Sequence, residues 1–186
     1  SSYIDKWAGF PLYQNTQTKY YSCGEEMFPD MLEALRGAKH FIFLEYFIIE
    51  EGYMFNTILD ILEEKAKAGV DVRFIYDDVG SINSISFGYY KKLQERRIPC
   101  VTFNPFKPLI SVVMNNRDHR KIFVVDGYIG FTGGINLADE YINKVKRFGY
   151  WKDTGVRIEG EAVWSLTAMF LEMWNYCLLY TSPSPR

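Results

Sequence analysis

The sequence predicts an α/β fold, because helical and strand-like segments alternate along the chain. Apolar residues recur at helical spacing in several segments, whereas shorter segments are continuously apolar, as in buried strands. An Asp-Gly pair at 126–127 separates two short apolar runs, which is a strong hairpin signal. Together these observations predict an α/β/α sandwich around a mixed, largely parallel sheet.

The predicted helices are amphipathic segments with recognisable ends. Pro29 is tolerated near a first helical turn, and Gly69 suits the position just after a helix. Helices are expected at residues 25–38, 53–68, 87–97 and 162–176.

The predicted strands are short apolar runs between these helices and around the Asp-Gly pair. Glu45 is the exception, because it is a charged residue in the middle of the first run. Strands are expected at residues 41–49, 70–76, 98–103, 122–126, 129–133 and 153–158.

Length and composition favour one ordinary globular domain. A chain of 186 residues can bury a sizeable core without disulfides or metals. Its net charge is −2, so the dominant basic character of nucleic-acid binders is missing and no nucleic-acid partner is expected. The three cysteines are widely spaced and only two histidines are present, so neither a disulfide framework nor a metal centre is expected.

One stretch of the chain carries a catalytic pattern. It reads H-x-K-x4-D-x6-G-G-x-N and comprises His119, Lys121, Asp126, Gly133-Gly134 and Asn136. A histidine and a lysine two residues apart in an extended segment lie on one face, which places a nucleophile or proton carrier beside a cation. Such a set suits an anionic phosphoryl group, where catalysis is mostly positioning and charge stabilisation.

This pattern is the HKD signature of the phospholipase D superfamily, and the resemblance extends over most of the chain. The sequence resembles the first catalytic half of bacterial cardiolipin synthases from about residue 11 to about residue 176. Residues 1–176 are therefore expected to form the first HKD domain, and residues 177–186, which depart from the family, a non-native or disordered tail. The segments that carry the likeness beyond the motif are residues 11–15, 40–47, 76–81 and 148–155.

The resemblance implies a phosphatidyltransferase without metal or organic cofactor. The complete enzyme would convert two phosphatidylglycerols to cardiolipin and glycerol through a phosphohistidine at His119. Lys121, Asn136 and Gly134 would bind the phosphate. Asp126 belongs to the catalytic motif, but its opposite parity to Lys121 predicts that it points away from the phosphate and supports the backbone or a basic group, or only forms the turn before Gly127.

Glu45 has two open interpretations. A buried carboxylate needs a partner, so Glu45 either forms a structural ion pair or orients a catalytic histidine from behind. Asp77 and Asp78, at the end of a predicted strand, could join such a network or act as turn residues.

The apolar stretch at 106–114 also has two interpretations. It is either core or interdomain packing, or an apolar entrance for acyl chains. Three basic clusters (residues 91–97, 117–121 and 144–152) are candidates for surface decoration or, for the last two, for contact with an anionic headgroup.

The superfamily builds its active site from two HKD motifs, and this sequence contains one H-x-K. The second half would come from the same longer chain or from a homodimer mate. A single-motif phospholipase or nuclease acting as a homodimer, and an inactive half that only binds membrane or a partner half, remain alternatives. By resemblance, the partners are phosphatidylglycerol, other anionic phospholipids and the membrane surface. The full-length protein is expected at the bacterial cell membrane with a cytoplasmic catalytic domain, and no segment here is long enough to cross a bilayer.

Overall fold

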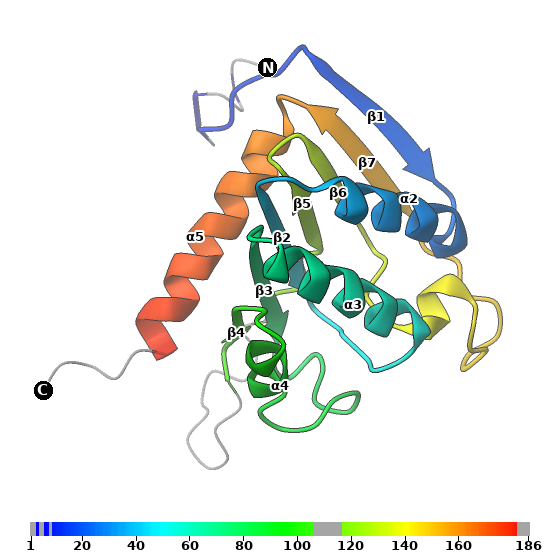
Figure 1. Cartoon of the computed structure of the whole chain (residues 1–186). Helices are drawn as coiled ribbons and strands as arrows, with labels where there is room; N and C mark the ends of the chain where they lie inside the picture. The colour runs from blue at the N-terminus through cyan, green and yellow to red at the C-terminus, as the bar shows by residue number, and fades with distance from the viewer. Residues whose placement is uncertain (1–2, 4–5, 8, 106–116, 182–186) are drawn as a thin grey trace, which may run out of the picture.

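The structure, a computed structural model, is built around one seven-stranded sheet (Figure 1). It describes the chain except for residues 1–2, 4–5, 8, 106–116 and 182–186, and the side chains of residues 180–181. The strands are β1 (Thr16–Tyr21), β2 (Phe41–Tyr46), β3 (Asp71–Asp77), β4 (Cys100–Phe103), β5 (Ile122–Val125), β6 (Ile129–Gly133) and β7 (Gly155–Gly160).

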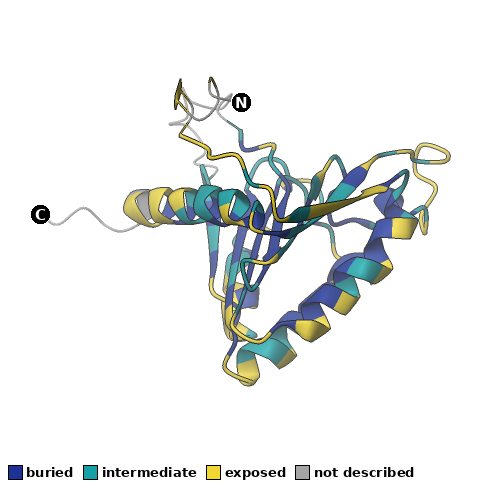
Figure 2. Cartoon of the chain, turned by 90° about the horizontal axis from the view of Figure 1, so that it is seen from above, coloured by how far each residue is buried: buried dark blue, intermediate teal, exposed yellow. Residues whose placement is uncertain are grey.

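Helices cover both faces of this sheet, which confirms the predicted α/β class. Helices α2 (Gly24–Gly37) and α3 (Tyr53–Lys67) pack side by side on one face, and α5 (Val163–Thr181) lies on the other (Figures 1 and 2). The short helix α4 (Tyr90–Glu95) lies beside β4, and a 3-10 turn, η1 (Asp139–Ile142), contacts α2 and α3.

The sheet is mixed, but it is less parallel than the sequence predicted. The strand order is β1-β7-β6-β5-β2-β3-β4, and only the β2–β3 and β3–β4 pairs are parallel. The other four pairs are antiparallel. Parallel neighbours need a crossover such as α3, whereas β5 and β6 are joined by the tight turn at 126–128 and run in opposite directions.

The sheet has a hydrophobic core on each face, and the side chains of β2 point alternately into one core and the other. Ile42 and Leu44 belong to the larger core under α2 and α3, whereas Phe43 packs with Phe170 and other residues of α5. Glu45 has the parity of Phe43, so its carboxyl group lies on the α5 side of the sheet.

Several predicted boundaries were wrong. Strand β1 was not predicted, β2 ends at Tyr46, and α4 is shorter than the expected 87–97 helix. Helix α5 continues to Thr181, so 177–181 extend the fold, and Cys177 is buried. Among the described helices, none combines the length and the apolar character needed to cross a bilayer. The apolar stretch at 106–114 lies outside the described residues.

Candidate active site

The motif residues other than Asp126 gather at one end of the strands of the sheet. Gly133 pairs with Gly155 across β6 and β7, and Glu45 pairs with Ile122 across β2 and β5. Lys121 directly precedes β5, so it lies in the row formed by the end of β2, the end of β6 and the start of β7. Residues from four strands therefore meet at this end of the sheet.

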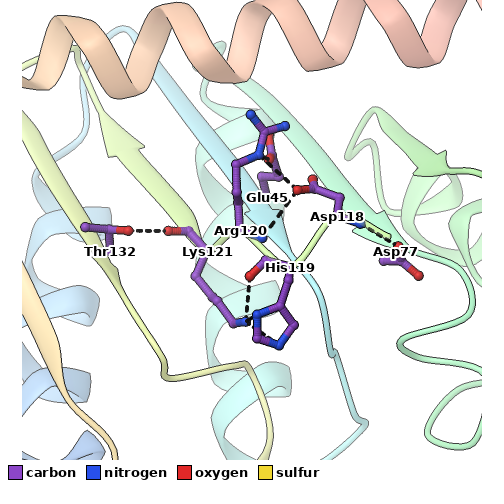
Figure 3. Close-up of polar contacts among 7 residues, drawn as sticks. All are labelled: Glu45, Asp77, Asp118, His119, Arg120, Lys121 and Thr132. Atoms are coloured by element: carbon purple, nitrogen blue, oxygen red, sulfur yellow. Dashed lines mark hydrogen bonds and ion pairs between the residues drawn. The ribbon is translucent and has the colours of Figure 1, made fainter. Parts of the chain in front are cut away.

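His119 and Lys121 are in direct contact at this edge (Figure 3). The Nζ atom of Lys121 lies 3.2 Å from Nδ1 and 3.3 Å from Nε2 of His119, and it donates a hydrogen bond of 2.7 Å to the His119 carbonyl oxygen. Thr132 Oγ1 donates to the Lys121 carbonyl oxygen at 2.9 Å, which ties this segment to β6. The predicted pairing of a histidine and a cation on one face is present, although both residues precede the regular strand.

The two side chains differ in exposure. His119 is exposed, and its ring packs against Phe47 at a centroid distance of 4.7 Å. Lys121 is only 4% exposed, and its Nζ lies 5.5 Å from the Phe47 ring centroid. Burial lowers the pKa of Lys121, while the nearby charges of Asp153 and Asp118 oppose that shift. An arriving phosphate would supply the anion that this desolvated ammonium group needs.

Asn136 is buried and holds two segments together. Its Oδ1 accepts a hydrogen bond from the Ile48 backbone N–H at 3.0 Å, and its Nδ2 donates to the Tyr141 hydroxyl at 2.9 Å. One Nδ2 proton is thus engaged in the structure, which leaves the second for the predicted bond to a phosphate oxygen.

The glycine pair leaves room for neighbouring groups. Gly133 has φ of 147°, and a methyl group there would overlap the Thr154 carbonyl oxygen. A methyl group at Gly134 would overlap the carboxylate of Asp153. The glycines therefore admit the start of β7, and with it Asp153, to the edge that carries Lys121.

A buried charge cluster lies on the opposite side of the same segment. Figure 3 shows Arg120, Asp118 and Glu45 directed toward α5, away from His119 and Lys121. Arg120 Nε lies 2.9 Å from both Glu45 Oε1 and Asp118 Oδ1, and its N–H is directed at Asp118. Neither Glu45 oxygen has a well-directed hydrogen-bond donor among the described residues.

Glu45 holds its proton more strongly than an ordinary glutamic acid side chain. Burial raises the pKa of Glu45 to about 9, and the adjacent Asp118 adds to the shift, while Arg120 acts against it. Of the two open interpretations, the structure supports an ionic contact with Arg120 and shows no contact between Glu45 and a histidine. The cluster instead fixes the two residues that flank His119 in sequence.

Asp77 fixes the backbone just before the histidine. Its Oδ2 accepts the Asp118 backbone N–H at 3.0 Å, its Oδ1 accepts those of Val79 and Gly80, and it forms an ion pair with Arg117. Asp77 is therefore both a turn residue and part of the network around the motif.

Asp126 lies far from the other motif residues. Its carboxylate accepts hydrogen bonds from the backbone N–H groups of Lys39, His40 and Phe41 at 2.7–2.9 Å. Burial would raise the pKa of Asp126, but these three bonds lower it below its usual value. The four residues of β5 separate it from Lys121, a distance of roughly 16 Å. The structure does not bring Asp126 together with His119, because the two residues lie beyond opposite ends of β5.

Sequence reasoning overlooked Asp118, Phe47, Tyr141 and Asp153 as parts of this site. Tyr141 lies only five residues after Asn136, but its contact with Asn136 depends on the turn at η1. Asp153 comes from a later segment, and no local pattern indicated that it reaches the motif. Among the described residues, no group of three or more histidines, cysteines and carboxylates is arranged to hold a metal ion.

The site and fold match one known protein family. The family model described as "Cardiolipin synthase, PLD-like domain" matches residues 31–174. The chain belongs to this phospholipase D-like family. The match includes every motif residue and the strands that position them.

Relatives and a solved structure agree with this assignment. A protein of Streptococcus mutans described as uncharacterized is 50% identical over 175 residues, covering 94% of this chain and 38% of that protein. A cardiolipin synthase of Alkalihalophilus pseudofirmus is 44% identical over 167 residues, covering 89% of this chain and 33% of that protein. The chain thus spans about a third to two fifths of the length of these relatives. The structure of Nuc, a phospholipase D family member from Salmonella typhimurium, shares the fold with a TM-score of 0.59 and 22% identity, covering 88% of this chain and 93% of Nuc.

Proposed function

We propose that this phospholipase D-like domain supplies one half of a phosphatidyltransferase site that converts two phosphatidylglycerols to cardiolipin and glycerol. The observation that carries the proposal is the contact between the exposed ring of His119 and the buried ammonium group of Lys121, 3.2 Å apart. A nucleophile beside a poorly solvated cation suits attack on an anionic phosphodiester.

The proposed reaction has two displacements at phosphorus. A ring nitrogen of His119 attacks the phosphorus of one phosphatidylglycerol, and the bond from phosphorus to the headgroup glycerol breaks. The leaving glycerol takes a proton from a general acid of the second half. A headgroup hydroxyl of the second phosphatidylglycerol then gives its proton back to that group of the second half, attacks the phosphorus of the phosphohistidine and breaks the P–N bond, which releases His119. Lys121 and the second Nδ2 proton of Asn136 would bind the non-bridging oxygens in both steps.

The second half would come from the longer protein or from another copy of this chain. The printed sequence contains one H-x-K, and the named cardiolipin synthase relative is about three times as long as the matched region. A single site that uses one histidine as nucleophile and another as general acid therefore needs a second motif.

The test is glycerol release and cardiolipin formation from phosphatidylglycerol vesicles over a range of protein concentrations. We expect release that rises faster than linearly with concentration, as two copies assemble, and that His119→Asn abolishes. Adding a second half prepared from a cardiolipin synthase relative should raise the rate. A folded chain that releases no glycerol even with that second half added would refute the proposal, as would an active His119→Asn variant.

A second candidate is a single-motif phosphodiesterase that acts as a homodimer. It is supported by the coverage of 93% of the Nuc chain, which shows that a folded chain of this kind can consist of little more than this domain. Phosphatidic acid instead of cardiolipin as the product would favour a phospholipase. DNA cleavage with a steep salt dependence would favour a nuclease.

A further inference from the structure

An exposed loop between η1 and β7 has a composition unlike the rest of the chain. Residues 144–152, here called the basic–aromatic loop, contain four Lys and Arg residues and no acidic residue, whereas the whole chain has a net charge of −2. Lys146 and Lys152 are exposed, and Arg147 pairs with Glu50 at 2.9 Å. The loop is therefore a local cationic surface on an acidic protein.

Large apolar side chains alternate with these cations. Val145, Phe148 and Tyr150 are 47%, 73% and 64% exposed. Exposed aromatic rings among lysines are typical of segments that lie at a membrane–water interface, where rings enter the headgroup region and ammonium groups meet lipid phosphates.

The base of the loop is held closed by one side chain. Asn143 Nδ2 donates to the Trp151 carbonyl oxygen at 2.8 Å, and Asn143 Oδ1 accepts the Trp151 backbone N–H at 2.6 Å. The Trp151 ring packs against Tyr141 and, at 5.9 Å, against Phe148. The exposed tip is thus presented by a fixed base.

Both ends of the loop are tied to the candidate active site. At one end Tyr141 is hydrogen-bonded to Asn136, and at the other Asp153 fills the space beside Gly134. Arg147 bonds to Glu50, three residues after Phe47, the residue that packs on His119. In Figures 1 and 2 this segment projects at the side of the molecule opposite the C-terminal end of α5, and Figure 2 shows it as exposed.

A protein partner fits this surface less well than a lipid surface. Three of the four cations are lysines, which are depleted in protein interfaces. If the loop met its own copy across a twofold axis, like charges would face each other.

We propose that the basic–aromatic loop docks this domain on an anionic phospholipid surface, with Phe148 in the headgroup region and Lys146 and Lys152 over lipid phosphates. This placement would bring the His119 edge to the bilayer from which its substrate comes, and to that extent it rests on the proposed function.

The test is vesicle flotation, with every variant in a His119→Asn background so that turnover cannot change the lipids. Vesicles of phosphatidylcholine alone are compared with vesicles that also contain phosphatidylglycerol. Phe148→Ser should weaken binding to the anionic vesicles roughly tenfold, and Lys146→Ala and Lys152→Ala roughly fivefold each. The matched controls are Tyr128→Ser, an exposed ring on the β5–β6 turn at the opposite edge, and Lys91→Ala, an exposed lysine on α4; both should bind normally.

Several outcomes would count against membrane docking by the loop. Equal binding of loop and control variants, equal binding to neutral and anionic vesicles, or no vesicle binding would overturn the proposal. So would a loss of self-association, measured by sedimentation velocity, with unchanged vesicle binding, which would make the loop a protein interface. Vesicle binding could depend on the loop while the protein with His119 intact releases no glycerol, even with a second half added. That result would refute the proposed function and leave the docking proposal standing.

Discussion

The carboxylate of Asp153 occupies the space that a side chain at Gly134 would need. The same carboxylate is close enough to Lys121 to oppose the lowering of that lysine's pKa by burial. Because Gly134 has no side chain, the carboxylate of Asp153, two residues before β7, can reach the motif.

Replacing Gly134 with alanine should therefore displace Asp153. We expect transfer activity to fall at least about tenfold and the free energy of unfolding to fall by about 1–3 kcal/mol, as in other overpacked sites. Urea unfolding and glycerol release measure the two effects. Gly37→Ala is the control, since a methyl group there meets nothing within 4 Å and should leave activity unchanged. A fully active Gly134→Ala protein would contradict this view of the site.

Lys121→Met should remove the charge while keeping most of the side-chain volume. We expect a loss of about 10²–10³-fold in transfer rate, comparable to removing one transition-state donor, with little loss of stability because a desolvated cation is removed. Because burial lowers the pKa of Lys121, the alkaline limb of the wild-type pH–rate profile should begin below the pKa of an ordinary lysine, about 10.4. A Met variant with wild-type rates would rule out the phosphate clamp.

Glu45→Gln should be well tolerated, because burial raises the pKa of Glu45 and so disfavours its charged form. Its folded-state pKa, about 9, exceeds its unfolded value, about 4.3, so the folded protein binds an extra proton between these values and wild-type stability falls as the pH rises. The free energy of unfolding of the Gln variant should fall less over this pH range. We expect the difference from the wild type to exceed about 1 kcal/mol between about pH 6 and about pH 8. Urea unfolding at a series of pH values measures it.

The matched substitution Glu45→Ala should behave differently. It would leave the buried Asp118 and the half-buried Arg120 around a cavity and cost about 3 kcal/mol or more. Identical pH slopes for the wild type and the Gln variant would show that Glu45 is ionised in the folded protein.

Asp126→Asn should weaken the fold without changing the chemistry. An amide has one acceptor oxygen in place of two, so at least one of the three backbone bonds is lost, at a cost of about 1–3 kcal/mol in urea unfolding. The folded-state pKa of Asp126 is depressed, so its contribution is present above the unfolded pKa, about 3.9, and is lost as the pH falls through the folded value. The acid-induced loss of stability should be smaller in the Asn variant. A reduced transfer rate per folded molecule would instead place Asp126 in the reaction.

The sequence predicted the central strands, three of the four helices and the meeting of His119 with Lys121, because periodicity is a local property. It failed for β1, where only Tyr21 is buried, so the strand has no apolar pattern and depends on pairing with the distant β7. Strand directions also escaped prediction, since they depend on which crossovers the tertiary fold uses.

The candidate site was also predicted only in part. The sequence predicted that Asp126 supports the backbone or a basic group, and its carboxylate accepts three backbone N–H bonds. The partner of Glu45 stayed open, because a strand pattern shows that a carboxyl group is buried but not what lies across from it. Asp153 was missed for a related reason: it reaches Lys121 only through the β6–β7 pairing and the space beside Gly134.

The spacing between the lysine and the aspartate of the motif is the length of a strand. Lys121 lies before the four residues of β5 and Asp126 just after them, so the signature extends from the end of β5 beside His119 to the end beside the turn at 126–128. A search that requires the aspartate therefore selects chains that can close this turn, whether or not they react. A chain that keeps the aspartate and loses the histidine would therefore keep this turn and lose the nucleophile proposed for it.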